Sequence, residues 1–349
     1  MSESKFYHFT STELFYGVTS LDDAVAASKE GGYVWFNFYQ PSREELCSLI
    51  DKIGIHPLSV EDCFDDKQVP KIEYFQSNTF IIFNAFTYAE KTLFIDEINL
   101  FIGKNYLITV SGHNSGTRKP LEGITEVIEN GHSNAKDGPD FLMHMVLDYL
   151  VDKKYKAFDD LEDELEEAED LLIENVEKFQ PGQLIHLRKH LLVLRKSLFY
   201  EREILVKIYR KDCPFITEKA VVHYRDIYDH LAKFFELTET YREIETSLME
   251  LYTSLLNNLM TRSSNETNAS VRRLTLITTV FMPLTLLASI GGMSEWSMIT
   301  GPENWKTTYP LFLMGMVVIA LLNYMLLKRL EKKGNPFLPS KSEVEQEEK

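Results

Sequence analysis

The chain has 349 residues, of which 44% are hydrophobic and 26% charged, and its formal net charge is −16 at pH 7. This acidic balance argues against a nucleic-acid binder, whose electrostatic footprint is a basic patch or stripe. It is compatible with concentrating cations near the protein, and simple solubility is the alternative explanation. The three cysteines, an odd number without CxxC spacing, indicate neither a disulfide framework nor a zinc site. The N-terminus has no apolar segment, so we expect no cleaved signal peptide.

The first 138 residues are typical of a mixed α and β domain. The strand candidates are rich in aromatic and β-branched residues, and they are 33–38, 79–88, 94–103 and 105–110. The last two are separated by a short glycine-containing link, 103–105, of the hairpin kind. Ser42 is expected to cap a helix over 43–53, with Glu45 completing a capping box.

Residues 139–213 are predicted to form an acidic helical hairpin. The segment 159–170 contains nine acids and no base. Such a run is usually a solvated helix face, and a cation-attracting role is the alternative. The break at 180-QPGQ-183 separates two helices, and Cys213-Pro214 ends the second one.

A very long helix follows, because the chain has no proline between Pro214 and Pro283 and no glycine between Gly182 and Gly291. A helix over 218–293 would be roughly 110 Å long at about 1.5 Å per residue. Since this length far exceeds one bilayer, most of the helix must stand in water. Its apolar positions recur at spacings of three and four, which predicts packing against partners as a coiled-coil stalk.

Two uncharged windows near the C-terminus are long enough to cross a membrane. Basic residues flank them on the outer sides, at Arg272 and Arg273 before the first and at Lys328 and Arg329 after the second. The positive-inside rule therefore places both termini in the cytoplasm of a multi-pass protein of the cell membrane. The predicted organisation is a cytoplasmic αβ domain (1–138), an acidic hairpin (139–213), a stalk helix (214–273), a first span (274–293), an extracytoplasmic loop (294–308), a second span (309–327) and a basic end with a disordered tail (328–349).

The first span has two different faces. Steps of three and four from Val271 trace a face of mixed apolar and hydroxyl residues, which continues through Leu274, Thr278, Met282, Thr285 and Ser289. The opposing positions are wholly apolar. The hydroxyls can bond to carbonyls of their own helix or pack helix against helix. If several copies align in parallel around an axis, this face would instead line a narrow path, with Met282 as a hydrophobic constriction.

Three stretches, 55–75, 225–230 and 274–290, together with the order of the segments, resemble the CorA family of two-span divalent-cation transporters. The resemblance covers nearly the whole chain. It implies an α+β cytoplasmic domain with a long helical stalk and two transmembrane helices, assembled as a funnel-shaped homopentamer in membrane lipid. It also implies that the first span lines the pore, at the same six positions from 271 to 289, and that Mg²⁺ is the default substrate.

The chain departs from the family at the pore mouth. The family signature is Tyr-Gly-Met-Asn, whereas this chain has Gly291-Gly292-Met293-Ser294. The family asparagine forms a ring that meets the hydrated ion, and the shorter Ser294 predicts a wider, less discriminating ring. Co²⁺, Ni²⁺ and Zn²⁺ therefore stay open as substrates. Glu295 either supplies negative charge at the mouth or is a solvated loop acid.

The family also places regulatory cation sites between the cytoplasmic domains of neighbouring subunits. Asp226 matches an acid used there, and Glu90 and Asp96 are weak candidates for its partner. The alternative for Asp226 is a surface acid of the stalk. Divalent cations are thus the expected substrate, and they are also the regulator if Asp226 serves at such a site.

Two functions of different classes remain open. The leading one is a channel or transporter for divalent cations, and the alternative is a poorly conducting membrane-anchored sensor or scaffold of the same shape. An enzyme is not indicated, because the sequence shows no nucleophile–base set and no glycine-rich phosphate loop. The face from 271 to 289 has no charged residue, as expected for a conducting pore rather than a degenerate one.

Overall fold

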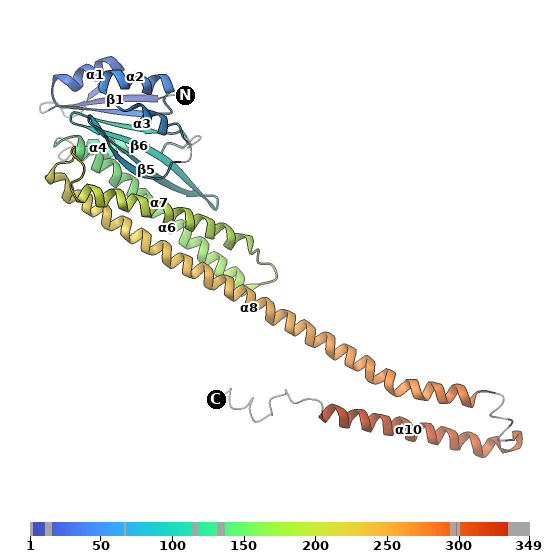
Figure 1. Cartoon of the computed structure of the whole chain (residues 1–349). Helices are drawn as coiled ribbons and strands as arrows, with labels where there is room; N and C mark the ends of the chain where they lie inside the picture. The colour runs from blue at the N-terminus through green and yellow to red at the C-terminus, as the bar shows by residue number, and fades with distance from the viewer. Residues whose placement is uncertain are drawn as a thin grey trace. The chain divides into compact units, whose positions relative to one another are not determined.

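The computed structural model describes residues 3–10, 16–65, 68–113, 118–130, 137–293, 298 and 301–333. The chain divides into two compact units, Met1–Ser254 and Leu255–Lys349 (Figure 1). The first holds an α/β domain with long helices, and the second holds the end of the longest helix and one further apolar helix. The predicted fold class is thus confirmed for the single chain.

Seven strands form one sheet in the order β2-β1-β3-β7-β6-β5-β4. Their bounds are β1 Glu3–Phe9, β2 Tyr16–Val18, β3 Tyr33–Tyr39, β4 Lys71–Tyr74, β5 Asn78–Ala89, β6 Thr92–Gly103 and β7 Tyr106–Ser111. Among the described residues, β3 and β7 pair in parallel and the other neighbouring strands pair antiparallel. The four strands predicted from the sequence are confirmed to within two residues at each end, whereas β1, β2 and β4 were not predicted.

One face of the sheet carries three short helices, α1 (Leu21–Glu30), α2 (Arg43–Ile53) and α3 (Pro57–Asp62) (Figure 1). Alternate side chains of β3, which include Phe36 and Phe38, point into the core beneath them. The capping box of α2 is confirmed, because the Ser42 hydroxyl accepts from the Glu45 amide at 3.1 Å and the Glu45 carboxylate accepts from the Ser42 amide at 3.2 Å. A further helix, α4 (Ile124–Asn130), follows β7.

The opposite face carries the helical hairpin, made of α6 (Pro139–Glu174) and α7 (Gly182–Tyr209). A buried ion pair joins the two helices of the hairpin, and a hydrogen bond from β5 ties this pair to the sheet. Lys154 Nζ on α6 lies 2.5 Å from Glu201 Oε2 on α7, and both side chains are fully buried. Glu201 also accepts from the backbone amide of Asn84 on β5 at 3.1 Å. Burial lowers the pKa of Lys154 and raises the pKa of Glu201, while each charge opposes the shift of the other.

Part of the acidic run on α6 has structural partners. Glu162 accepts from the Tyr241 hydroxyl at 2.8 Å, Glu164 accepts from the Tyr88 hydroxyl, and Glu167 lies 2.7 Å from Lys91 Nζ. Other acids of the run, such as Asp163 and Glu166, are exposed. The run is therefore a solvated helix face with three anchoring contacts.

The long helix α8 spans Glu218–Gly291 in 74 residues, so the predicted continuous helix is confirmed to within two residues at its end. After η1 (Pro302–Asn304), the helix α10 (Trp305–Lys333) follows. By length and composition, α8 and the segment Lys306–Arg329 of α10 each contain a window apolar enough to cross a membrane.

Candidate functional site

The hydroxyl-bearing face of the first span, which we call the 271–289 face, is exposed along its whole length in the single chain. Its apolar members Val271, Leu274 and Met282 are 55%, 65% and 71% exposed. Thr278, Thr285 and Ser289 are exposed as well. An exposed apolar and hydroxyl stripe of this length is available for contact with other chains, lipid or an ion path.

The threonine hydroxyls on this face are bonded within their own helix. Thr278 Oγ1 donates to the carbonyl of Leu274 at 2.8 Å, and Thr285 Oγ1 donates to the carbonyl of Phe281 at 2.9 Å. The back-bonding alternative raised from the sequence is therefore present. A hydroxyl has one hydrogen and two lone pairs, so each oxygen that donates inward can still accept a bond from water on the exposed side.

The opposite side of α8 is covered. Its half-buried positions are Leu276, Val280, Pro283, Leu284, Leu287 and Gly291. A matching half-buried stripe on α10 consists of Thr308, Phe312, Met316, Ala320, Asn323 and Leu327. Figure 1 shows α10 running back beside the end of α8. At about 100° per residue, the covered stripe of α8 is centred about 180° from the 271–289 face, so α8 turns its hydroxyl face away from α10.

The two helices approach closely at Gly291, the position where the family has a tyrosine. A Cβ atom added to Gly291 would lie 2.7 Å from the ring of Phe312. Phe312 on α10 therefore occupies space next to the backbone of α8 that a tyrosine at 291 would need. The aromatic group at this level comes from the second span instead of the first.

Of the predicted pore mouth, the structure describes Gly292 and Met293. The Gly292 amide donates to the carbonyl of Ala288 at 3.0 Å, and the Met293 amide donates to that of Ile290 at 3.2 Å, so the helix ends here. Met293 is 54% exposed. Ser294 and Glu295 lie outside the described residues.

Asp226, the predicted regulatory acid, lies on α8 beside two acids of α6. Its carboxylate is 71% exposed and lies 3.6 Å from His230 Nε2. Burial and then the negative charge of Asp226 raise the pKa of Asp148, while burial, Asp148 and, to a smaller extent, Asp226 raise the pKa of Asp152. The charges of three carboxylates and one imidazole on α6 and α8 thus act on one another, and we call this set the α6–α8 acidic cluster (Asp148, Asp152, Asp226, His230).

A second histidine group borders this cluster. The His144 and His223 rings lie 5.2 Å apart, and burial, together with the nearby His223, lowers the pKa of His144 to about 4. His230 is oriented by Tyr155, whose hydroxyl lies 2.7 Å from His230 Nδ1. Within the described part of one chain, no group of three or more His, Cys, Asp or Glu side chains is arranged to hold a metal ion.

The two candidate partners of Asp226 differ in their surroundings. Asp96 is buried and receives two bonds from Arg118, at 3.1 Å from Nε and 3.0 Å from Nη2. Glu90 stands in the turn between β5 and β6 with a φ of 51° and is exposed. Because Arg118 already neutralises the carboxylate of Asp96, Glu90 is the more accessible of the two.

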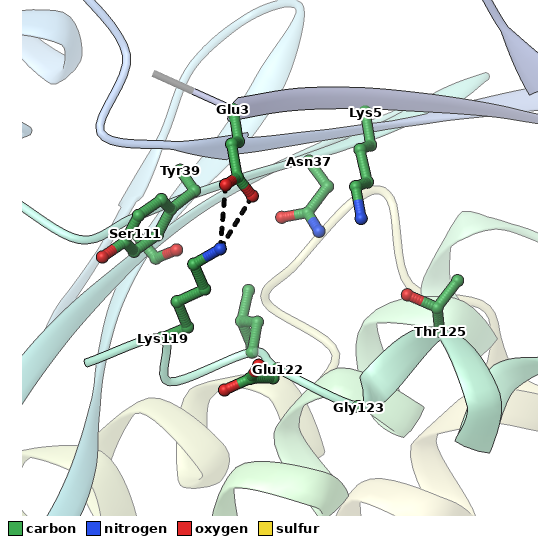
Figure 2. Close-up of a pocket in the computed structure, with 10 residues that line it drawn as sticks. Glu3, Lys5, Asn37, Tyr39, Ser111, Lys119, Glu122, Gly123 and Thr125 are labelled. Carbon is green, nitrogen blue, oxygen red and sulfur yellow. Dashed lines mark hydrogen bonds and ion pairs between the residues drawn. The ribbon is translucent and has the colours of Figure 1, made fainter. Parts of the chain in front are cut away.

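The α/β domain also has a polar cavity of about 140 Å³, shown in Figure 2. Lys119 Nζ lies 2.9 Å from both oxygens of Glu3 and closes one wall, while Lys5 and Asn37 point into the space from the sheet. Two ammonium groups disfavour a divalent cation. The Glu3–Lys119 pair fastens β1 to the segment before α4, and we assign the cavity no part in cation binding.

An α+β domain, the 74-residue helix α8 with its charge-free hydroxyl face and the second apolar helix α10 give the arrangement of a two-span membrane protein. The family model described as "CorA-like Mg2+ transporter protein" matches residues 30–329. The cobalt/magnesium transport protein CorA of Thermotoga maritima is 31% identical over 299 residues, covering 84% of this chain and 82% of its own. The complete structure of the CorA magnesium transporter from Methanocaldococcus jannaschii matches with a TM-score of 0.68 and 26% identity, covering 93% of this chain and 97% of its own. A zinc transport protein, ZntB of Yersinia enterocolitica, is 21% identical over 307 residues, covering 87% of this chain and 89% of its own.

The chain belongs to the CorA-like Mg²⁺ transporter family. It is therefore a divalent-cation transporter of that family rather than an enzyme, and its two candidate spans agree with a membrane protein. Relatives named for magnesium, cobalt and zinc leave the preferred ion open.

Sequence reasoning found Asp226 but missed its neighbours. Asp148 and Asp152 on α6, and Asp226 and His230 on α8, are each four residues apart. This spacing places each pair on one face of its helix, and it was the available signal. That the two faces meet follows only from the packing of α6 against α8.

Proposed function

We propose that this protein conducts hydrated divalent cations, with Mg²⁺ as the main substrate, through a homopentamer whose pore is lined by the 271–289 face of α8. The observation that carries the proposal is the placement of this face, which has no charged residue and lies opposite the side that α10 covers. In a ring of copies with α10 outside, the hydroxyl face of each α8 points to the axis. Both termini then lie in the cytoplasm, since the basic residues flank the spans on that side.

Several copies are needed because one helix pair cannot enclose a path. A single chain leaves Val271, Leu274 and Met282 exposed, and more than one copy must meet to surround a pore with them. Mg²⁺ loses its water reluctantly. Threonine oxygens whose hydrogens point into the helix offer acceptors to the waters of a hydrated ion, and Met282 narrows the path without holding a charge.

At the mouth we assign Ser294 the role of meeting the hydrated ion, with Gly292 and Met293 shaping the turn and Glu295 adding negative charge. A hydroxyl bonds an ion's water at about 1 kcal/mol net. Serine is shorter than the family's asparagine, so fewer bonds form at once. The loss of two such bonds relaxes discrimination by roughly tenfold or more, because about 1.4 kcal/mol corresponds to one decade.

We further propose that the α6–α8 acidic cluster is one half of a regulatory cation site, completed by a neighbouring subunit. Asp148, Asp152 and Asp226 repel one another, and a divalent cation with oxygen ligands would relieve that repulsion. Glu90 of a neighbouring copy is the accessible acid for the other half. Cation binding at this contact would hold the cytoplasmic domains together when internal Mg²⁺ is high.

Ion flux into liposomes that contain the purified full-length protein tests the transport proposal, with Mg²⁺, Co²⁺, Ni²⁺, Zn²⁺ and Na⁺ compared in one preparation. We expect Mg²⁺ flux with modest preference over the other divalent ions and little Na⁺ flux. Ser294→Asn should raise the preference for Mg²⁺ roughly tenfold, whereas Ser297→Asn, the matched control in the same loop, should not. No divalent flux from a well-assembled oligomer would instead support a sensor or scaffold.

The regulatory site is tested separately by thermal unfolding with and without Mg²⁺. The parent should be stabilised by added Mg²⁺, and Asp226→Ala should lose most of that stabilisation. Glu236→Ala, which removes an exposed acid from the same helix, is the control and should respond like the parent. An equal Mg²⁺ response of all three proteins would contradict the role of Asp226.

A further inference from the structure

A groove of about 370 Å³ lies between the end of α7 and the beginning of α8, lined by Val206, Tyr209, Arg210, Arg225, Tyr228 and Asp229. Each helix contributes three residues at positions i, i+3 and i+4, so the lining comes from two facing helix surfaces. Ligand sites usually span about 300–1,000 Å³. The groove is therefore large enough for one small molecule.

The groove is positively charged although the chain as a whole carries a net charge of −16. Neither Arg210 nor Arg225 forms a side-chain hydrogen bond or ion pair with any described residue, and Asp229 is the single carboxylate of the lining. A third guanidinium, that of Arg202, borders the groove and donates to the Tyr228 hydroxyl at 3.4 Å. Arginine presents planar donors that match phosphate oxygens, so two unpaired guanidiniums favour a phosphate-bearing anion.

Two tyrosines give the groove an aromatic side. Tyr209 is 52% exposed at the end of α7, and Tyr228 is half-buried, with the guanidinium carbon of Arg202 5.6 Å from its ring centre. Aromatic rings bind the face of a flat heterocycle by stacking. Asp229 can accept hydrogen bonds from hydroxyl or amino groups between the two ends.

We propose that this groove binds a nucleotide, with its phosphate on Arg210 and Arg225 and its base against Tyr209 and Tyr228. The site is distinct from the α6–α8 acidic cluster, because Arg225 and Asp226 are adjacent in sequence and so point about 100° apart on α8. A cation is excluded from the groove by its guanidiniums. The proposal does not depend on whether the chain conducts Mg²⁺.

Titration of the full-length protein with a fluorescent N-methylanthraniloyl derivative of ADP, at physiological ionic strength, tests the proposal. Saturable binding that is displaced by unlabelled AMP or ADP is expected. Arg225→Gln and Arg210→Gln should each weaken binding about tenfold or more, since each removes charge-assisted bonds. Lys207→Gln removes a positive charge from an exposed position of α7 outside the groove. This variant should leave the affinity for the nucleotide unchanged.

Further arms separate the ring from the phosphate. Tyr209→Ala should weaken the binding of the labelled nucleotide. Arg210→Gln and Arg225→Gln should both keep the parent's oligomeric state and helical content. Displacement by inorganic phosphate at the concentration at which AMP displaces would overturn a nucleotide site in favour of a simple anion site. Equal loss with Lys207→Gln and Arg225→Gln, or no saturable binding, would overturn the groove as a site altogether.

Discussion

The two compact units differ in whether their apolar side chains are buried within the single chain. Among the described residues, every buried apolar side chain lies at or before Leu248. The apolar windows of α8 and α10, by contrast, contain no buried residue in the single chain. The first unit completes a core within the single chain, whereas the second leaves the apolar side chains of its two helices unburied there.

Buried polar groups show the same difference. In the first unit, buried charged side chains are ion-paired, as Lys154 is with Glu201 and Asp96 is with Arg118, or hydrogen-bonded, as Glu164 is to Tyr88. In the second unit, hydroxyls such as those of Thr278 and Thr285 are bonded to their own helix. Self-contained bonding suits helices whose surroundings are lipid and neighbouring helices. The following predictions test this difference between the two units.

The largest effect is expected in the first unit, from breaking the buried ion pair. Lys154→Met leaves the carboxylate of Glu201 buried without a partner, which should lower the free energy of unfolding by about 3–5 kcal/mol. The double variant Lys154→Met/Glu201→Leu should recover much of this loss because it removes both charges. Thermal unfolding of the full-length protein in detergent measures both, and a loss below about 1 kcal/mol for Lys154→Met would contradict the prediction.

In the second unit, the largest effect is expected where α8 and α10 approach closely. Gly291→Ala forces a Cβ to within 2.7 Å of the Phe312 ring, and overpacking of this kind costs about 1–3 kcal/mol. Gly292→Ala is the matched control, because its nearest neighbour would be a carbonyl oxygen 3.4 Å away. Oligomer stability in detergent should fall for the first variant more than for the second. Equal behaviour would mean that the two spans do not pack as described.

A smaller effect should follow pH in the first unit. The pKa of His144 is lowered from 6.5 to about 4, so the folded state disfavours its proton. The resulting stability is fully present above pH 6.5 and is lost as pH falls toward 4. Between pH 7.5 and 5.5 we expect a loss of about 1 kcal/mol. His144→Gln should flatten this part of the curve of unfolding free energy against pH, and an unchanged slope would place the titration elsewhere.

Much of the fold could be predicted from local patterns. Short apolar windows predict the strands β3, β5, β6 and β7, and the residue types at Ser42 and Glu45 predict the capping box. The absence of proline and glycine over a long stretch predicts the unbroken α8. The strand β1 was not predicted because its first three residues, Glu3, Ser4 and Lys5, are polar or charged, which leaves only a short apolar stretch after them. The parallel pairing of β3 with β7 joins segments far apart in the chain, and no local pattern specifies it.

The candidate site divides in the same way. Helical spacing alone placed Thr278, Met282 and Thr285 on one face of α8. The sequence could not predict that this face points away from α10, because the orientation of the face depends on which stripe of α8 the second span covers. The α6–α8 acidic cluster and the groove at Arg225 each need two helices brought together by tertiary packing.

The central claim, that the 271–289 face lines the ion path, is tested most directly by single cysteines in a Cys47→Ser background, which removes the exposed native thiol. Met282→Cys and Thr285→Cys lie on the face, and Leu287→Cys lies on the stripe covered by α10. A charged, water-soluble thiol reagent should block Mg²⁺ flux into liposomes for the first two variants and leave the third unaffected. Equal block of all three, or block of Leu287→Cys alone, would contradict the account.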